Sequence, residues 1–166
     1  MKITARTTVP YRRKRAGLTN YKKRLGLLKS GKYRFVVRKS LNNTLAQVIE
    51  YAPDGDKILI SAHSSELKKY GWKGHTGNIP SAYLTGYLAG VKAKAKKIPE
   101  AIVDFGLLPS TKGSRLYATV KGAIAAGLSL PANAEIFPQD AIIDGKFVKV
   151  KQALPPIIKA MQGVRS

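Results

Sequence analysis

The sequence has no cysteine and few carboxylates, and each shortage argues against a class of protein. Without cysteine, the 166-residue chain has no disulfide bond, no cysteine-ligated zinc site and no thiol nucleophile. Only nine Asp and Glu residues are present. Two-metal hydrolysis of a phosphodiester needs several converging carboxylates, whereas Asp54 and Asp56 fall in a predicted turn and Glu100 and Asp104 are isolated. This pattern predicts no metal site and argues against a nuclease.

A long hydrophobic segment is also missing. The longest apolar run, around residues 79–91, is interrupted by Pro80, Ser81, Thr85 and Gly86, and a membrane-spanning helix needs about 18 apolar residues or more. No apolar core of a secretory signal follows the first charges. We therefore expect a cytoplasmic protein without a membrane partner, and the 44% hydrophobic content suffices for the core of one domain.

Positive charge is what the sequence has in excess. Thirty Lys and Arg residues give a formal net charge of +21, and residues 1–40 hold fourteen of them with no acidic residue. Such a field attracts polyanions, and neutralising phosphates releases their counterions. The composition therefore predicts a nucleic-acid partner.

The N-terminal region has two basic parts. Residues 1–16 lack apolar periodicity and contain the run Arg12, Arg13, Lys14 and Arg15, which predicts an arm that orders on its partner; a solvated tail or a localisation signal is the alternative. A short helix is predicted next, capped by Thr19 or Asn20 and ending at Ser30-Gly31. It carries Lys22, Lys23 and Arg24, and Tyr11 and Tyr21 are available to stack on bases.

Alternating hydrophobicity predicts three antiparallel strands at residues 33–38, 44–51 and 57–62. In the first strand, Phe35 and Val37 would face the core while Arg34 and Arg38 would form a cationic face.

Helical spacing marks residues 81–97 and 115–126, the second with Leu116, Val120, Ala123 and Ile124 inward. A stripe of small residues, including Gly86 and Gly90, would let the first of these helices approach the sheet. Residues 101–108 predict a central strand parallel to the first, reached by a helical crossover.

The predicted fold class is α/β: a mixed sheet of about five strands, with an antiparallel meander plus a parallel strand, packed by two main helices. A basic N-terminal arm (residues 1–18) precedes the α/β RNA-binding domain (residues 19–130), and an irregular C-terminal extension (residues 131–166) follows it. Within the extension, a hairpin is predicted at 141–150 and a short helix at 157–162.

Candidate chemistry is sparse. His63 and His75 have no nucleophile or metal-ligand partner at a recognised spacing, and Ser64 and Ser65 resemble a helix cap rather than part of a triad. The glycine-rich loop around Trp72 lacks nucleotide-binding patterns, and its tryptophan could equally stack on RNA or fill the core. We expect no catalytic residue, no cofactor and no small-molecule substrate.

Several segments resemble one family, the archaeal form of the large-ribosomal-subunit protein L-eighteen. They are YRRKR at residues 11–15, YKKRLGLLKSGK at 21–32, and SAHSSEL followed by YGWKGHTGNIPSAYLTGYLAG at 61–67 and 70–90. The likeness spans about residues 5–130. It implies a non-enzymatic structural constituent of the large ribosomal subunit that binds 5S rRNA, touches 23S rRNA in the central protuberance, and adjoins neighbouring ribosomal proteins.

The residues expected to face RNA follow from the charge pattern together with this resemblance. They lie in the arm, the first helix, the turn after the first strand, the Trp72 loop and the loop before the second main helix: Tyr11, Arg12, Arg13, Lys14, Arg15, Tyr21, Lys22, Lys23, Arg24, Arg38, Lys39, Ser40, Asn42, Asn43, Trp72, Lys73 and Lys112. Two rival hypotheses are a general DNA-binding module, favoured by charge alone, and a metal-dependent nuclease.

Overall fold

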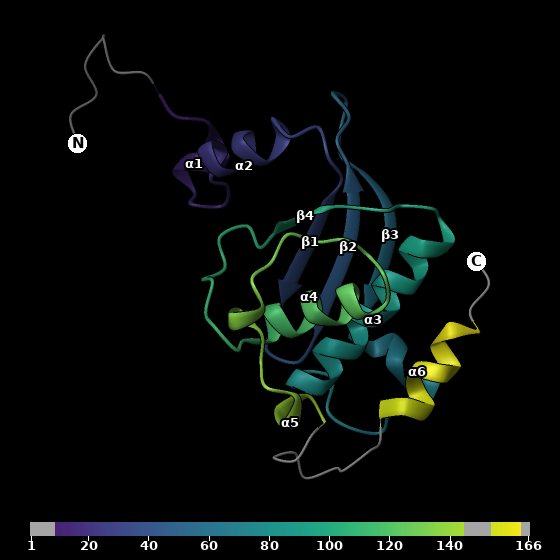
Figure 1. Ribbon diagram of the computed structural model, residues 1–166. Coiled ribbons are helices and arrows are strands. Elements are labelled where there is room, and N and C mark those ends of the chain that lie inside the picture. Colours follow the sequence, from purple (N-terminus) through teal and green to yellow (C-terminus); the bar gives the residue numbers. More distant parts are fainter. Residues whose placement is uncertain (1–8, 145–153, 164–166) are drawn as a thin grey trace.

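The computed structural model describes residues 9–144 and 154–163, and its centre is a four-stranded sheet (Figure 1). The strands are β1 (Arg34–Lys39), β2 (Thr44–Glu50), β3 (Lys57–His63) and β4 (Ile102–Asp104). β1, β2 and β3 form the expected antiparallel meander. β4 pairs in parallel with β1, so the order across the sheet is β3-β2-β1-β4. The predicted mixed α/β class is confirmed.

Helices precede, connect and follow the strands. The first is short and falls in the expected irregular arm. Two long helices, α3 and α4, pack against each other beside the sheet (Figure 1). The helices are α1 (Arg12–Arg15), α2 (Tyr21–Leu28), α3 (Ile79–Ala95), α4 (Arg115–Ala125), α5 (Asp140–Ile143) and α6 (Leu154–Gln162), with the 3₁₀ helices η1 (Ser64–Tyr70) and η2 (Ala134–Ile136).

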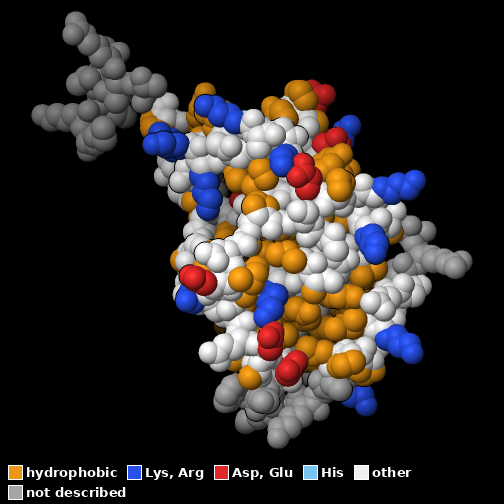
Figure 2. All heavy atoms as spheres, in the orientation of Figure 1, with side chains coloured by type: hydrophobic (Ala, Val, Ile, Leu, Met, Phe, Trp, Pro, Cys, Tyr) orange, Lys and Arg blue, Asp and Glu red, His pale blue; other side chains and the backbone are white. Residues whose placement is uncertain are grey.

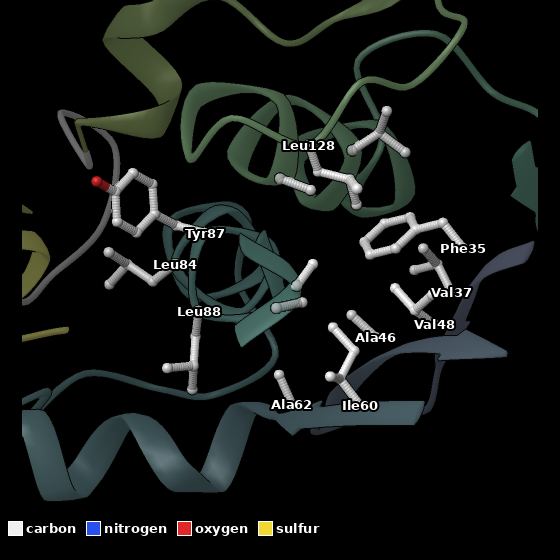
Figure 3. Packing of buried hydrophobic residues seen from close by; sticks show 14 of the residues in the cluster. Phe35, Val37, Ala46, Val48, Ile60, Ala62, Leu84, Tyr87, Leu88 and Leu128 are labelled. Carbon is white, nitrogen blue, oxygen red and sulfur yellow. The ribbon is translucent and has the colours of Figure 1, made fainter. Parts of the chain in front are cut away.

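The core lies between one face of the sheet and the two long helices (Figure 3). Alternate residues of each strand point into it, because successive side chains of a strand face opposite sides of the sheet. Leu84 and Leu88 of α3 and Leu116 and Val120 of α4 are fully buried, as expected, whereas Ile124 is 36% exposed rather than inward. The strands supply Phe35, Val37, Ala46, Val48, Ile60 and Ala62.

The small-residue stripe of α3 contacts another helix, which corrects the prediction that it faces the sheet. A Cβ atom on Gly86 would overlap the carbonyl oxygen of Thr119 in α4, and one on Gly90 would lie 2.8 Å from the carbonyl oxygen of Ala123. Gly122 of α4 makes the reciprocal close approach to the carbonyl oxygen of Tyr83. The two helix backbones therefore touch where only glycine leaves room for them.

The parallel strand is shorter than predicted and lies at the edge of the sheet. β4 spans three residues and pairs with β1 alone, so the expected central strand over 101–108 is wrong in length and position. The chain turns away after Asp104, because Gly106 has φ = +61° and its N–H donates to Asp104 Oδ1 at 2.7 Å. The described residues thus give four strands instead of about five.

The C-terminal extension is more regular than expected in its described part. Residues 140–143 form α5 instead of the first strand of a hairpin, and an aspartate in its first turn suits a helix N-terminus. The remainder of the predicted hairpin lies outside the described residues. The short helix is confirmed as α6, whose Leu154, Ile157 and Met161 are buried in the core at helical spacing.

Candidate nucleic-acid interface

The basic run of the arm forms α1, all of whose side chains are exposed. No residue of α1 is buried, so its four cations contribute nothing to the core. Arg13 Nε donates to Thr19 Oγ1 at 2.9 Å, and the ring of Tyr11 lies 5.3 Å from that of Tyr21. These two contacts hold α1 against the start of α2 and concentrate positive charge there (Figure 2).

Of the two predicted caps, Asn20 is the one that precedes α2, and its side chain accepts a hydrogen bond from the N–H of Lys23 at 3.0 Å. Its basic residues then differ in their surroundings. Lys22 is exposed, and Lys23 Nζ donates to the carbonyl oxygen of Gly106 at 3.0 Å. Arg24 pairs with Asp56 in the β2–β3 turn, with Nη2 at 3.0 and 2.9 Å from the two carboxylate oxygens. Part of the helix's charge therefore attaches α2 to the sheet.

Arg34 is the centre of this attachment, and its burial corrects the prediction that it belongs to a cationic face. Its side chain is 3% exposed and lies 2.7 Å from Asp56 Oδ2 and 3.4 Å from Asp104 Oδ2. Burial raises the pKa of Asp56, but hydrogen bonds and charge attraction from Arg34 and Arg24 outweigh it and leave the pKa below its ordinary value. The carboxylate is therefore ionised at neutral pH and joins α2 to β1.

Arg38 remains partly accessible at the end of β1. Its Nη1 donates to the carbonyl oxygens of Val37 and Asp104, each at 2.8 Å, while 43% of the side chain is exposed. A Cβ on Gly106 would lie 2.9 Å from Arg38 Nη2, so the guanidinium packs on the loop after β4. The neighbouring Lys39 is half-buried. Arg38 thus offers one edge of a positioned guanidinium to an outside ligand.

The turn after β1 is fixed by hydrogen bonds to two other segments. The side chain of Asn43 accepts from Ser64 Oγ at 3.1 Å and from Thr76 Oγ1 at 3.0 Å. Ser40 Oγ accepts from the N–H of Asn43 at 3.0 Å. Asn42, whose carbonyl oxygen accepts from Thr76 Oγ1 at 2.7 Å, is exposed. Asn43 therefore builds the turn, while Asn42 projects from it.

Arg115 also fixes the turn after β1, and the sequence analysis did not predict this role. It donates to the carbonyl oxygens of Ser40 and Leu41, both at 3.2 Å, and of Gly77 at 2.7 Å. A cation in the first turn of a helix opposes the helix dipole, so its presence at the start of α4 could have signalled a specific partner. Lys112, three residues earlier, is exposed.

Trp72 lies in the core, which decides between the two hypotheses that the sequence left open. The residue is 4% exposed, and its Nε1–H donates to the carbonyl oxygen of His75 at 3.3 Å. A Cβ on Gly74 would lie 2.7 Å from the indole ring, so the loop closes tightly over it. Lys73 is exposed beside it. The buried indole therefore shapes the loop, while the neighbouring Lys73 is exposed to solvent.

The two histidines have structural contacts. His63, rather than Ser64 or Ser65, caps η1: its ring Nδ1 accepts from the N–H of Ser65 at 3.2 Å, and Glu66 accepts from the N–H of His63 at 2.9 Å. His75 Nδ1 accepts from the N–H of Gly77 at 3.0 Å. In residues 9–144 and 154–163, no group of three His, Cys, Asp or Glu side chains could hold a metal ion.

The described helices also include none that is long and apolar enough to cross a membrane. What the structure offers instead is two sets of exposed polar and basic side chains, on α1–α2 and around the turn after β1. In class, a mixed α/β domain with such exposed basic surfaces fits a nucleic-acid-binding protein.

Comparison with known proteins identifies the family. Residues 5–98 match the family model described as ribosomal large subunit proteins 60S L5 and 50S L18. The large ribosomal subunit protein uL18 of the archaeon Methanococcus maripaludis is 49% identical over 149 residues, which cover 90% of this chain and 77% of the relative. The chain belongs to this ribosomal protein family. It is a structural protein of the large subunit, cytoplasmic like the ribosome, and not an enzyme.

Proposed function

We propose that this protein binds 5S rRNA and helps to attach it to 23S rRNA in the central protuberance of the large subunit. The observation that carries the proposal is the pair of exposed basic elements α1 and α2, of which α2 is held to the sheet through Asp56 and Arg34. Because irregular RNA presents closely spaced phosphates in fixed positions, a cationic surface of fixed shape can select one fold.

The two sets of residues have different tasks in this proposal. Arg12, Lys14 and Arg15 of α1 and Lys22 of α2 neutralise phosphates, which supplies affinity without sequence preference. Arg38, Asn42 and the loop shaped by Trp72 contact irregular parts of the RNA with directional hydrogen bonds. Ser40 and Asn43 position these groups from within the turn. Lys39, Lys73 and Lys112 add charge nearby.

Competition between RNAs tests this proposal. Labelled 5S rRNA is bound by the purified protein in a gel-shift assay, and unlabelled 5S rRNA, transfer RNA or duplex DNA is added in excess. We expect only 5S rRNA to displace the label efficiently. Transfer RNA displacing it equally well would contradict selective binding, and duplex DNA doing so would favour a general nucleic-acid binder.

A further inference from the structure

A groove lies between the N-terminal helices and the loop after β4. Its volume is about 390 Å³, within the range of pockets that hold small ligands, roughly 300–1,000 Å³. One wall comes from α1, α2 and the residues between them, and the other from the end of β4 and the loop that follows. The lining residues that matter below are Arg13, Leu18, Lys23, Arg38, Asp104 and Leu107.

Both walls of the groove expose large apolar side chains to solvent. Leu18 is 60% exposed on one wall, and Leu107 is 56% exposed on the other. Pockets that bind ligands are lined largely by apolar side chains, with a few polar groups that fix the orientation of the ligand. The groove therefore suits a ligand with an apolar surface of its own.

The same groove is strongly positive. Four basic side chains line it against a single carboxylate, Asp104, which is already engaged by Arg34, Arg38 and the N–H of Gly106. Arg13 and Lys23 are exposed at its rim, each with one hydrogen bond to a neutral oxygen of the protein. The ligand is thus expected to combine an apolar face with negative charge.

A nucleotide outside a double helix has this combination. In a paired region the faces of the bases are stacked on one another, so a protein meets only base edges, sugars and phosphates. An unpaired nucleotide can turn out and place its flat face against a side chain while its phosphate meets a cation. The apolar walls and basic rim match these two parts.

The loop wall is formed within the protein itself. Gly106 has φ = +61°, where other residues are strained, and it is fixed by the hydrogen bond to Asp104 and by packing on the Arg38 guanidinium. Lys23 ties α2 to the carbonyl oxygen of this same glycine. The groove is thus preorganised, which lowers the cost of ordering on binding.

We propose that this groove receives one unpaired nucleotide of the bound RNA, with its base between Leu18 and Leu107 and its phosphate beside Arg13 and Lys23. The proposal rests on the proposed binding of 5S rRNA and specifies where that RNA is recognised by shape rather than by charge alone.

Two matched variants test it, Leu107→Asp and Ile58→Asp. Ile58 is 57% exposed on β3, at the opposite edge of the sheet, so both variants replace an equally exposed aliphatic residue and change the net charge equally. Affinity for 5S rRNA is measured by gel shift, and nucleotide-resolution chemical probing reports which unpaired bases the protein protects. Thermal unfolding of each free variant establishes that it is folded.

We expect Leu107→Asp to weaken binding at least about tenfold and to lose protection at one unpaired nucleotide, with other protections intact. Ile58→Asp should show only the smaller loss due to one added negative charge. If Leu107→Asp does not fold, Leu107→Tyr replaces it and should keep both affinity and protection, because an aromatic face also stacks on a base.

The groove proposal is overturned if both Asp variants bind alike, if the lost protection lies at a paired nucleotide, or if Leu107→Tyr loses the protection. If the wild-type protein selects 5S rRNA but the variants give one of these contrary results, only the groove proposal is overturned and the proposed function stands. Wild-type protein that fails to select 5S rRNA overturns both.

Discussion

Trp72 is an aromatic residue in a polar loop of an RNA-binding family, a setting in which stacking on bases would be a natural role. In this protein the indole is instead buried, and its N–H is satisfied by the carbonyl oxygen of His75. A buried ring of this kind stabilises the folded chain, whether or not a ligand is bound. Under the proposed function, its influence on RNA would be indirect, through the shape of residues 71–78.

Replacing Trp72 by Ala is expected to lower the free energy of unfolding by about 3–5 kcal/mol, because a large buried ring is lost and a cavity remains. Urea unfolding of the free protein, followed by circular dichroism, measures this change. A variant with wild-type stability and weakened RNA binding would contradict the buried role and restore the stacking hypothesis.

Glycine positions provide a second residue-scale test. Gly86→Ala should destabilise the protein strongly, because the new methyl group would overlap the backbone of α4 at Thr119. Gly26→Ala in α2 is the matched control: nothing lies within 4 Å of the new Cβ atom, and alanine favours a helix over glycine by up to about 1 kcal/mol. We therefore expect the melting temperature to fall in Gly86→Ala and to rise slightly in Gly26→Ala. Equal shifts in the two variants would contradict the α3–α4 contact.

At the scale of elements, α2 is positioned by charge more than by apolar packing. None of its residues is buried. Asp56 and the carbonyl oxygen of Gly106 hold its Arg24 and Lys23 side chains, and Arg34 connects Asp56 to β1. A positively charged helix is thus fixed on a positively charged protein by one of the few carboxylates.

Asp56→Asn should therefore weaken RNA binding even though it makes the protein more positive. Loss of the carboxylate releases α2 and leaves the buried Arg34 with fewer partners, so we also expect lower stability. Gel shifts and hydrogen exchange of α2 amides measure the two effects, and Asp54→Asn, at an exposed residue of the same turn, is the control. Tighter binding by Asp56→Asn than by Asp54→Asn would show that net charge outweighs positioning.

The lowered pKa of Asp56 gives the pH dependence of this attachment. A carboxyl group whose pKa is lower in the folded than in the unfolded state contributes stability above its ordinary pKa of 3.8, and this contribution is lost as the pH falls through the folded value. We expect the stability difference between wild type and Asp56→Asn to be constant near neutral pH and to shrink below about pH 4. Urea titrations at pH 7, 5 and 3.5 measure it, and a difference that grows on acidification would contradict the assignment.

At the scale of the whole molecule, several of the scarce carboxylates are used in internal ion pairs. Besides the Asp56 and Asp104 contacts, Glu66 pairs with Lys92, Glu100 with Lys32 and Asp140 with Lys121, at N–O distances of 2.6–2.7 Å. These pairs connect segments distant in sequence. The cations of α1 form none of the described ion pairs, so much of the net charge faces outward there.

Changing Arg12, Arg13 and Arg15 together to Ala should leave the fold intact, because α1 buries no side chain. RNA affinity should fall, and the slope of log K against log salt should become shallower by about 0.7–0.9 for each phosphate that the variant no longer neutralises. Gel shifts at several salt concentrations measure the slope, and circular dichroism establishes folding. Unchanged affinity and slope would remove α1 from the interface.

The sequence by itself determined the main helices, the antiparallel meander and the segregation of positive charge along the chain. Alternation in β1–β3, helical spacing in α3 and α4, and a helix cap at Thr19 or Asn20 are local patterns that depend on the geometry of strands and helices alone. The resemblance carried by residues 61–67 and 70–90 led to the right family. The expected RNA contacts remain predictions.

Only the tertiary structure decided which charged and aromatic side chains are available to a ligand. Arg34 looks like a surface cation in an alternating strand, yet Asp56 and Asp104 come from other segments to pair with it. The burial of Trp72 and the contact of Gly86 with α4 likewise depend on partners far away in the chain. Burial and ion pairing are properties of what surrounds a residue in space, so local spacing in the sequence could not specify them.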